Sequence, residues 1–326
     1  MKRKWLLLCT IFSLLFSSCS LFDPSGNLET QDVRLLLPFR PDVQFAPFYV
    51  AMEKGYFSAE GLNVTFEHLP ENDAVALVGN GEAPFAVVSG EQVLLARAQE
   101  IPVVYVLAWW QDYPVAVAYP VESDIQSIED LVGKKIGIPG LFGASYIGFR
   151  ALISATGISE SDLTLDSIGN SQVEAMLAGQ EDAIVIYANN EPVQLEAQNF
   201  PVKLFKVADY VHLSSNGLIS NEEIIANNPA LVRSMVAATL KGIEDTIEDP
   251  EAAFEISKGF VEGLDQADQE VMLQVLKESI LFWQADQLGR SNPEAWENMD
   301  SILFEMGLLE SPLEVQEAFT NSFLPE

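Results

Sequence analysis

Two adjacent tryptophans, Trp109 and Trp110, stand at the end of an apolar run and are followed by Gln111. Indole faces stack on flat heteroaromatic rings, and each stacked base contributes roughly 1–3 kcal/mol. Because neighbouring residues of a strand point to opposite faces, we expect one of the two tryptophans to face a ligand. The alternative is that both indoles pack in a core, where buried tryptophan is common. Gln111 is a candidate for binding the polar edge of such a ring.

Polar and aromatic residues also follow two apolar runs nearer the start of the chain. Gln44 and Phe45 lie between the first expected strand and the first expected helix. Gln44 could donate to a ring carbonyl while Phe45 stacks, or Gln44 could be solvated while Phe45 packs inward. Ser89 opens a helix directly after a strand. Its hydroxyl could therefore bind a ligand acceptor or only cap the helix.

A glycine-rich loop at residues 140–146 connects an expected strand to an expected helix. Gly143 allows the backbone to approach a ligand closely, and Ser145 and Tyr146 add hydrogen-bonding groups. Phe142 is an aromatic candidate in the same loop. The loop has neither the GxxxxGK(S/T) pattern of a phosphate-binding loop nor the GxGxxG pattern of a dinucleotide site. We therefore exclude an NTPase or a dehydrogenase.

A third group of candidates, Tyr187, Asn190 and Glu191, directly follows a buried apolar run. A glutamate can accept a hydrogen bond from an amino or imide N–H, and an asparagine can donate and accept. The alternative is a capping asparagine followed by an exposed glutamate at a helix start. Asn216, in a later apolar segment, is a weaker candidate for ligand binding.

The composition argues against most catalytic and metal chemistry. The two histidines, His68 and His212, are far apart in sequence, which makes a histidine metal centre or a Ser-His-Asp triad an unlikely design. The two cysteines, Cys9 and Cys19, both lie near the N-terminus. We therefore expect no catalytic residues, no metal and no cofactor. A net charge of −31 also argues against nucleic acid as a partner.

Short apolar runs alternate with helical patterns through the first two thirds of the chain. This alternation predicts an α/β protein with mostly parallel sheets. The expected strands are residues 33–38, 62–67, 85–88, 103–108, 135–138, 163–168, 183–187 and 202–206, with helices such as 48–57, 73–79 and 91–99 between them.

The last third, residues 222–324, reads as almost entirely helical, with Pro250 and Pro293 in the first turns of two helices. Two long apolar segments, residues 103–121 and 208–219, flank the middle of the chain. A chain that leaves one lobe, builds a second and returns needs two such crossings. We therefore expect two α/β lobes joined by a two-segment hinge, with a ligand between them. The boundaries predicted are 32–120 plus 208–326 for the first lobe and 121–207 for the second.

The N-terminus has the order of a secretory signal. A basic start is followed by a short apolar run and two small residues before Cys19. Residues 1–18 are therefore expected to be a signal peptide, and Cys19 a lipidated new N-terminus; the alternative is an ordinary cleaved signal. Residues 19–31, which contain proline, serine and glycine, are expected to form a tether between the lipid anchor and the folded domain.

Three stretches resemble one class of ABC importer solute-binding proteins, the thiamine-pyrimidine/sulfonate/nitrate/taurine class. They are QFAPFYVAMEKGYFSAEGLNV at residues 44–64, IEDLVGKKIGIPG at 128–140 and NPALVRSMVAATLKGIEDTIEDPEAA at 228–253. The phrase NNEPVQLEA at 189–197 resembles the thiamine-precursor binders within this class. AWWQDYPVAV at 108–117, GLFGASYIG at 140–148 and SNGLISN at 215–221 resemble the riboflavin-binding lipoproteins of riboflavin importers.

This resemblance implies a periplasmic-binding type II fold and a protein that binds a solute without being an enzyme. It implies an extracytoplasmic monomer, anchored to the cell membrane by Cys19, that delivers its ligand to an ABC permease. Riboflavin is the expected ligand, a thiamine pyrimidine precursor the second, and an alkanesulfonate, taurine or nitrate the third. Related folds include pyrimidine-synthesising enzymes, which need a reactive histidine and lack a signal. A purely structural lipoprotein is the remaining alternative.

Overall fold

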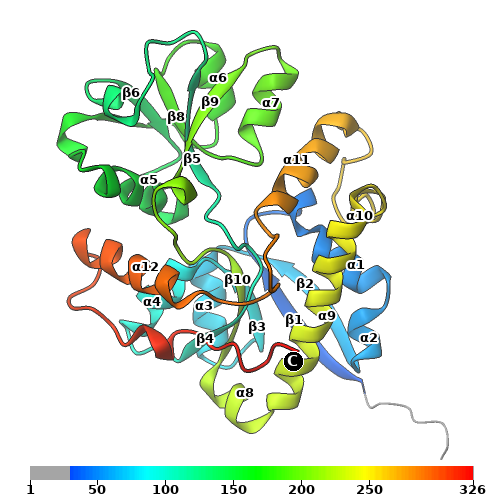
Figure 1. Cartoon of the computed structure of the whole chain (residues 1–326). Helices are drawn as coiled ribbons and strands as arrows, with labels where there is room; N and C mark the ends of the chain where they lie inside the picture. Colours follow the sequence, from blue (N-terminus) through cyan, green and yellow to red (C-terminus); the bar gives the residue numbers. More distant parts are fainter. Residues whose placement is uncertain (1–29, 326) are drawn as a thin grey trace, which may run out of the picture.

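The computed structural model describes residues 30–325, which form two α/β lobes, each built around a five-stranded sheet (Figure 1). The predicted signal peptide, the lipidation site Cys19 and most of the predicted tether lie outside the described residues. Within residues 30–325, no helix is both long and apolar enough to cross a bilayer.

Lobe 1, residues 30–108 and 217–325, contains the sheet of order β2-β1-β3-β10-β4. Its strands are β1 (Gln31–Leu37), β2 (Leu62–His68), β3 (Phe85–Val88), β4 (Val103–Ala108) and β10 (Gly217–Asn221). β1 pairs in parallel with β2 and β3, while β10 lies antiparallel between β3 and β4. The tether predicted to end at Gln31 overlaps the first residue of β1.

Lobe 2, residues 115–209, contains the sheet of order β7-β6-β8-β5-β9. Its strands are β5 (Val115–Pro120), β6 (Lys135–Ile138), β7 (Thr164–Ser167), β8 (Ala183–Tyr187) and β9 (Val202–Lys206). β6 is parallel to β7 and β8, whereas β5 is antiparallel to β8 and β9. Four of the five strands in each sheet therefore run in the same direction, as expected for mostly parallel sheets. The one antiparallel strand of each sheet, β10 or β5, enters from a crossing segment.

Strand β5 also corrects the predicted lobe boundary. Residues up to 120 were predicted to belong to the first lobe, but β5 pairs only with strands of the second sheet. The first crossing segment is therefore residues 109–114. The return crossing is residues 210–216, after a short 3-10 helix, η4 (Val207–Asp209), which packs on lobe 2.

Helices cover both sheets and extend lobe 1. Lobe 1 has α1 (Ala46–Glu53), α2 (Tyr56–Ala59), α3 (Glu71–Gly79) and α4 (Gly90–Arg97), and lobe 2 has α5 (Gly143–Thr156), α6 (Gln172–Leu177) and α7 (Glu191–Ala197). The C-terminal block contains α8 (Glu222–Asn227), α9 (Pro229–Glu248), α10 (Pro250–Ser257), α11 (Gln269–Leu281) and α12 (Pro293–Glu305).

Local sequence explains where the C-terminal helices begin. Asn228, Asp249 and Asn292 each accept a backbone N–H with the side chain, and a proline follows each as the first helical residue. Such caps satisfy helix N–H groups that have no partner inside the helix. The predicted positions of Pro250 and Pro293 are confirmed. The block is less continuously helical than expected, because residues 306–325 contain only a short 3-10 helix, η5 (Val315–Glu317).

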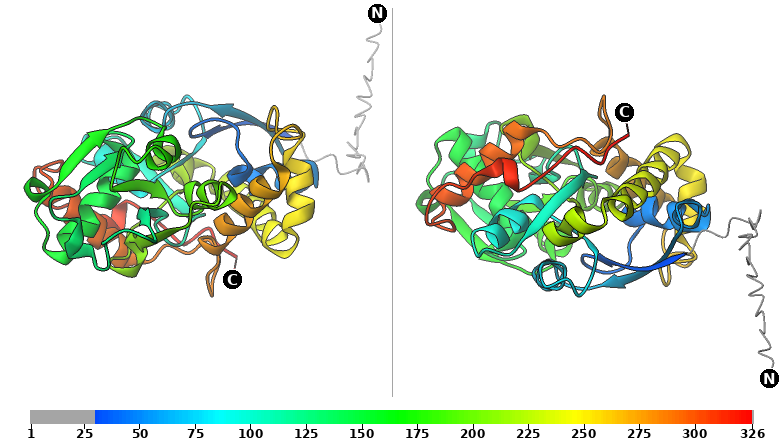
Figure 2. Two further views of the ribbon diagram at one scale, coloured as in Figure 1. Left: turned by 90° about the horizontal axis from the view of Figure 1, so that it is seen from above. Right: turned by 90° about the horizontal axis from the view of Figure 1, so that it is seen from below.

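The closest packing of the block is between α9 and α1, which lie side by side with α10 next to them (Figure 2). Gly242 of α9 makes this possible, because a Cβ at that position would lie 2.1 Å from the carbonyl oxygen of Pro47 in α1. The contact holds the helix that follows β1 in place. That helix is preceded by the short 3-10 helix η1 (Val43–Phe45), which reaches the space between the lobes.

We therefore expect Gly242→Ala to lower the free energy of unfolding by about 1–3 kcal/mol, since α1 and α9 must separate to admit a methyl group. Chemical denaturation of the two proteins measures the difference. The matched control is Gly259→Ala, where the nearest atom to a Cβ is 3.4 Å away and the residue does not have positive φ. Equal loss in both variants would contradict the tight α1–α9 contact.

Candidate functional site

A cleft of about 240 Å³ lies between the two lobes, and it is lined by the loops and helix starts that follow strands and by the two crossing segments. In lobe 1 the lining follows β1 and β2, and in lobe 2 it follows β6, β7 and β8. Ligands of open α/β sheets bind beyond the carboxyl ends of the strands. Nine predicted site residues line this cleft: Gln44, Phe45, Trp109, Trp110, Ser145, Tyr187, Asn190, Glu191 and Asn216.

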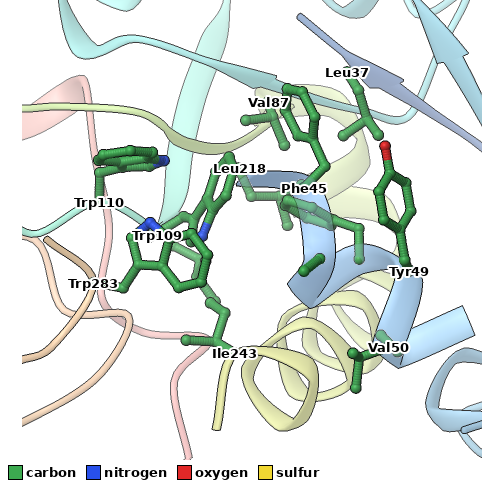
Figure 3. Packing of buried hydrophobic residues seen from close by; sticks show 14 of the residues in the cluster. Leu37, Phe45, Tyr49, Val50, Val87, Trp109, Trp110, Leu218, Ile243 and Trp283 are labelled. Atoms are coloured by element: carbon green, nitrogen blue, oxygen red, sulfur yellow. The ribbon is translucent and has the colours of Figure 1, made fainter. Parts of the chain in front are cut away.

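Aromatic side chains form the wall nearest the hinge. Trp109 contacts Phe45 and Trp283, with ring centroids 5.6 and 5.5 Å apart, and Trp110 packs against Phe282 at 5.8 Å. Figure 3 shows the three indoles gathered beside Phe45. Both Trp109 and Trp110 are only 2 % exposed, and both also line the cleft. The two tryptophans therefore pack in the core and also form part of the cleft wall.

Both tryptophans line the cleft, and the expectation that one of them faces a ligand stays a prediction. Strand β4 ends at Ala108, so the strand's alternation does not extend through the pair. The backbone N–H groups of Trp109 and Trp110 both donate to the backbone carbonyl oxygen of Asn216, at 3.1 and 2.9 Å. This shared acceptor lies on the other crossing segment, and it holds the two connections between the lobes side by side.

The opposite wall comes from the start of α7 in lobe 2. Glu191 accepts a hydrogen bond from the N–H of Tyr187 at 3.0 Å. Asn190 precedes the helix but makes no capping bond, since its side-chain oxygen accepts from Gln194 at 2.8 Å. Burial raises the pKa of Glu191 to about 7, and the negative charge of Asp42 from lobe 1 adds to that shift. Carboxylates from the two lobes therefore face the same space.

The cleft is acidic. Asp42, Glu71 and Glu191 line it, and no lysine, arginine or histidine is among the described residues that do so. Burial raises the pKa of both Asp42 and Glu71. An anion would have to enter this space without a positive partner, at a considerable electrostatic cost. The lining instead suits a neutral or cationic ligand with N–H groups and flat apolar faces.

Ser89 lies behind the cleft wall rather than on it. Its side chain is buried and bonds the carboxyl groups of Glu71 and Glu91. Neither predicted role of Ser89 is observed here, because it makes no side-chain capping bond at α4 and does not line the cleft. Its partner Glu71, the first residue of α3, is the group that reaches the cleft.

Four other predicted residues also lie outside the central cleft. Gln111 donates to the carbonyl oxygen of Ala108 at 3.0 Å. Phe142, which is 80 % exposed, lies with Gly143 and Tyr146 in an adjoining cavity of about 740 Å³. The two cavities share Glu71, Pro139, Ser145 and Tyr187. A role for these residues in ligand contact stays a prediction.

Several residues of the cleft were not predicted from the sequence. Asp42 follows β1 and accepts from the N–H of Gln44, so an aspartate between a strand and a 3-10 helix was the available signal. Asn189 is buried and donates to Ser279 of lobe 1 at 2.9 Å, a bond between the lobes that no local pattern indicates. The lining residues that were not predicted are Pro38, Phe39, Asp42, Glu71, Pro139, Asn170, Gln172 and Asn189.

The part of the chain that the structure describes has no group of three or more His, Cys, Asp or Glu side chains arranged to hold a metal ion. His68 contacts the carbonyl oxygen of Pro38 through Nδ1 and the ring of Phe45. Burial lowers the pKa of His68. Its position behind Phe45 makes it a packing residue of the lobe 1 wall.

Comparisons with known proteins agree with this architecture. The sequence profile of NMT1/THI5-like proteins matches residues 42–253. The riboflavin-binding protein RibY of Chloroflexus aurantiacus is 37 % identical, over 100 % of this chain and 99 % of its own length. The formylaminopyrimidine-binding protein of Halalkalibacterium halodurans is 28 % identical, over 98 % and 99 %. A Legionella pneumophila protein named as 4-amino-5-hydroxymethyl-2-methylpyrimidine phosphate synthase is 23 % identical, over 90 % and 92 %.

Among solved structures, the periplasmic aliphatic sulphonate binding protein SsuA of Escherichia coli superposes with a TM-score of 0.73 at 13 % identity. The match covers 89 % of this chain and 92 % of that one. Likeness at this identity concerns the fold alone. It confirms the predicted periplasmic-binding fold of two α/β lobes.

The raised pKa of Glu191 leads to a prediction about stability. The pKa of the Glu191 carboxyl group rises on folding from 4.5 to about 7. Its contribution to stability is fully present when the pH is below the pKa of the unfolded state. That contribution is lost as the pH rises through the pKa of the folded state. Between about pH 5 and about pH 8, the melting temperature should therefore fall less in Glu191→Gln than in the unsubstituted protein. Calorimetry at several pH values measures both slopes.

The control for this experiment is Glu196→Gln, an exposed residue of the same helix, which should melt with the slope of the unsubstituted protein. If Glu191→Gln also keeps that slope, the buried, acidic environment assigned to this wall is wrong.

Proposed function

The chain belongs to the NMT1/THI5-like family, and on that premise we propose that it is the solute-binding component of an ABC importer. The observation that carries the proposal is the cleft between the lobes, with two indoles on one side, carboxyl groups on the others and no basic side chain among its described lining. The relatives named as binding proteins match essentially the full chain. Because these matches span both lobes, they support one function for the whole chain.

We propose that the ligand is a flat nitrogen heterocycle, with riboflavin first. Trp109 and Trp110 line the cleft but are 2 % exposed, so in this proposal opening of the lobes uncovers a ring face for stacking. Glu191 offers an acceptor for an N–H at the edge of the ring. The 37 % identity to a riboflavin-binding protein supports riboflavin over an aminopyrimidine, whose named binder is 28 % identical. Stacking and hydrogen bonds must act together, since micromolar affinity needs about 8 kcal/mol.

An alkanesulfonate, taurine or nitrate is a weaker candidate. The likeness to a sulphonate-binding protein is one of fold, at 13 % identity. A sulfonate is a permanent anion, and the lining of the cleft contains Asp42, Glu71 and Glu191 without a positive side chain. Recognition of such a group normally uses arginine, lysine or a helix N-terminus with free N–H groups.

We propose binding without chemical change, although some relatives carry the name of a synthase. The two histidines are poorly placed for reaction, because His68 packs behind Phe45 and His212 is not among the lining residues. The predicted signal and Cys19 support an extracytoplasmic protein anchored by lipid, acting as a monomer with a permease in the cytoplasmic membrane. These features are proposals from the N-terminal sequence and from the relatives.

The mechanism that follows is capture by closure. The ligand binds the aromatic wall of lobe 1, and contacts from Tyr187, Asn190 and Glu191 of lobe 2 then stabilise the closed form. A ligand shifts such an equilibrium only through the extra contacts that closure adds. The permease would recognise the closed form, since only that form reports occupancy.

Ligand class is tested with the full chain, expressed with its own N-terminal segment. We expect saturable binding of riboflavin, seen as quenching of flavin fluorescence, and no binding of taurine or ethanesulfonate. Mass spectrometry of small molecules retained by the purified protein gives an independent identification. Saturable sulfonate binding with no bound flavin or aminopyrimidine would overturn the ranking of ligands.

The role of the indole wall is tested by Trp110→Leu, which should weaken riboflavin binding about 5- to 150-fold, the equivalent of one lost stacking contact. The matched control is Trp296→Leu. Trp296 is equally buried but packs between Tyr105 and Phe319, away from the cleft. Circular dichroism verifies folding in both variants. Equal loss of affinity in both would mean that the effect is one of stability and not of stacking.

A further inference from the structure

Behind the cleft wall, one serine hydroxyl bridges two carboxyl groups. The Oγ atom of Ser89 lies 2.5 Å from Oε2 of Glu71 and 2.6 Å from Oε1 of Glu91. Glu91, on α4, is completely buried, whereas Glu71, at the start of α3, lines the cleft. The serine therefore connects a group that a ligand can touch with one that it cannot.

The three side chains, Ser89, Glu71 and Glu91, hold one proton more than a serine and two ionised carboxylates would have. A serine hydroxyl carries one hydrogen, and an ionised carboxylate carries none. Two short oxygen–oxygen contacts need two hydrogens between them, and Ser89 supplies only one. One of the two glutamates must therefore be a carboxylic acid, and the network carries a single negative charge.

The neighbouring donors place that proton on Glu91. Both oxygens of Glu71 already accept hydrogen bonds, Oε2 from the N–H of Ser89 at 3.0 Å and Oε1 from Nδ2 of Asn216 at 3.2 Å. Apart from Ser89, the carboxyl group of Glu91 has weaker donors, its own backbone N–H and the hydroxyl of Tyr113 at 3.5 Å. That hydroxyl lies closer, at 3.0 Å, to the carbonyl oxygen of Ala144. Glu71 is thus the ionised partner. Glu91 donates to Ser89, and Ser89 donates to Glu71.

The surroundings agree with this assignment. Burial, and next the charge of Glu71, raise the pKa of Glu91 to about 8. The other titratable groups that face the pair are the phenols of Tyr105, Tyr113 and Tyr187, whose pKa values burial raises further, so they stay neutral. None of the ion pairs formed within residues 30–325 includes Glu71 or Glu91.

We propose that Glu71 is a ligand-binding residue of the cleft, an acceptor for an N–H group of the ligand, and that Glu91 positions it through the proton relayed by Ser89. The inference rests on the proposed function and adds a polar contact on the lobe 1 side of the ligand. When Glu91 ionises, Ser89 has one hydrogen for two carboxylates, and the like charges move apart. Affinity for the ligand should therefore fall as the pH rises through this ionisation.

The test uses two substitutions of the same shape in one network, with riboflavin as the probe. Glu71→Gln should weaken binding about tenfold to hundredfold at every pH, because a charged acceptor is lost. Glu191 also titrates in this pH range, so the profiles are compared in the Glu191→Gln background. There, adding Glu91→Gln should remove the fall in affinity between about pH 6 and about pH 9, since an amide N–H donates to Ser89 at all these values. The exposed control Glu82→Gln should keep the unsubstituted pH profile.

A measurement without ligand separates this inference from the proposed function. Near neutral pH, the protonated part of Glu191 also contributes to the C=O band of buried carboxylic acids, so the comparison is made in Glu191→Gln. Adding Glu91→Gln to that variant should weaken the C=O band in the infrared spectrum. Loss of that band in Glu71→Gln alone, or unchanged affinity of Glu71→Gln for riboflavin, would overturn the inference. Absence of riboflavin and aminopyrimidine binding at every pH would overturn the ligand class, and the infrared band would still decide the position of the proton.

Discussion

The carbonyl oxygen of Asn216 accepts hydrogen bonds from the backbone N–H groups of Trp109 and Trp110, and this pair of bonds joins the two segments that connect the lobes. The chain passes between the lobes twice, and this is where the two passes are joined. The same bonds fix the backbone of both tryptophans, so their indoles are held at the inner end of the cleft. The side chain of Asn216 extends the arrangement to Glu71 in lobe 1. Hinge and binding wall are therefore made from the same few residues.

The chemistry of the cleft follows from what surrounds this junction. The aromatic wall belongs to lobe 1 and the hinge, whereas Tyr187, Asn190 and Glu191 belong to lobe 2. A ligand that touches only one wall gains stacking or hydrogen bonding, and one that touches both also stabilises closure. The absence of basic side chains from the described lining, and the presence of carboxyl groups from both lobes, favour a ligand that is not an anion.

Much of the fold could be predicted because buried strands of α/β proteins are short apolar runs with clear ends. Strand β5 was missed because residues 103–121 are apolar almost throughout and read as one crossing segment, although Asp112 and Pro114 mark a turn before the strand. Strand β10 was missed for a different reason. Its place between β3 and β4 depends on pairing across more than a hundred residues, which no local pattern encodes.

The site was predictable to the extent that its residues directly follow strands. Gln44, Tyr187 and Glu191 were found in this way and line the cleft. Ser89 follows a strand too, yet it lies behind the wall, because Glu71 from another element comes between it and the cleft. Glu71 itself could not be singled out among 48 acidic residues, since only the tertiary structure brings it next to Glu91 and Asn216.

The central position of β10 in the lobe 1 sheet also determines the order in which the lobes can be completed during synthesis. All strands of lobe 2 lie within residues 115–206, so its sheet can form once that stretch has emerged. The lobe 1 sheet lacks the strand between β3 and β4 until residue 221 is available, and it has two unpaired edges in the meantime. During synthesis, the lobe that emerges first is thus exposed to aggregation or chaperone binding for longer than the lobe that emerges second.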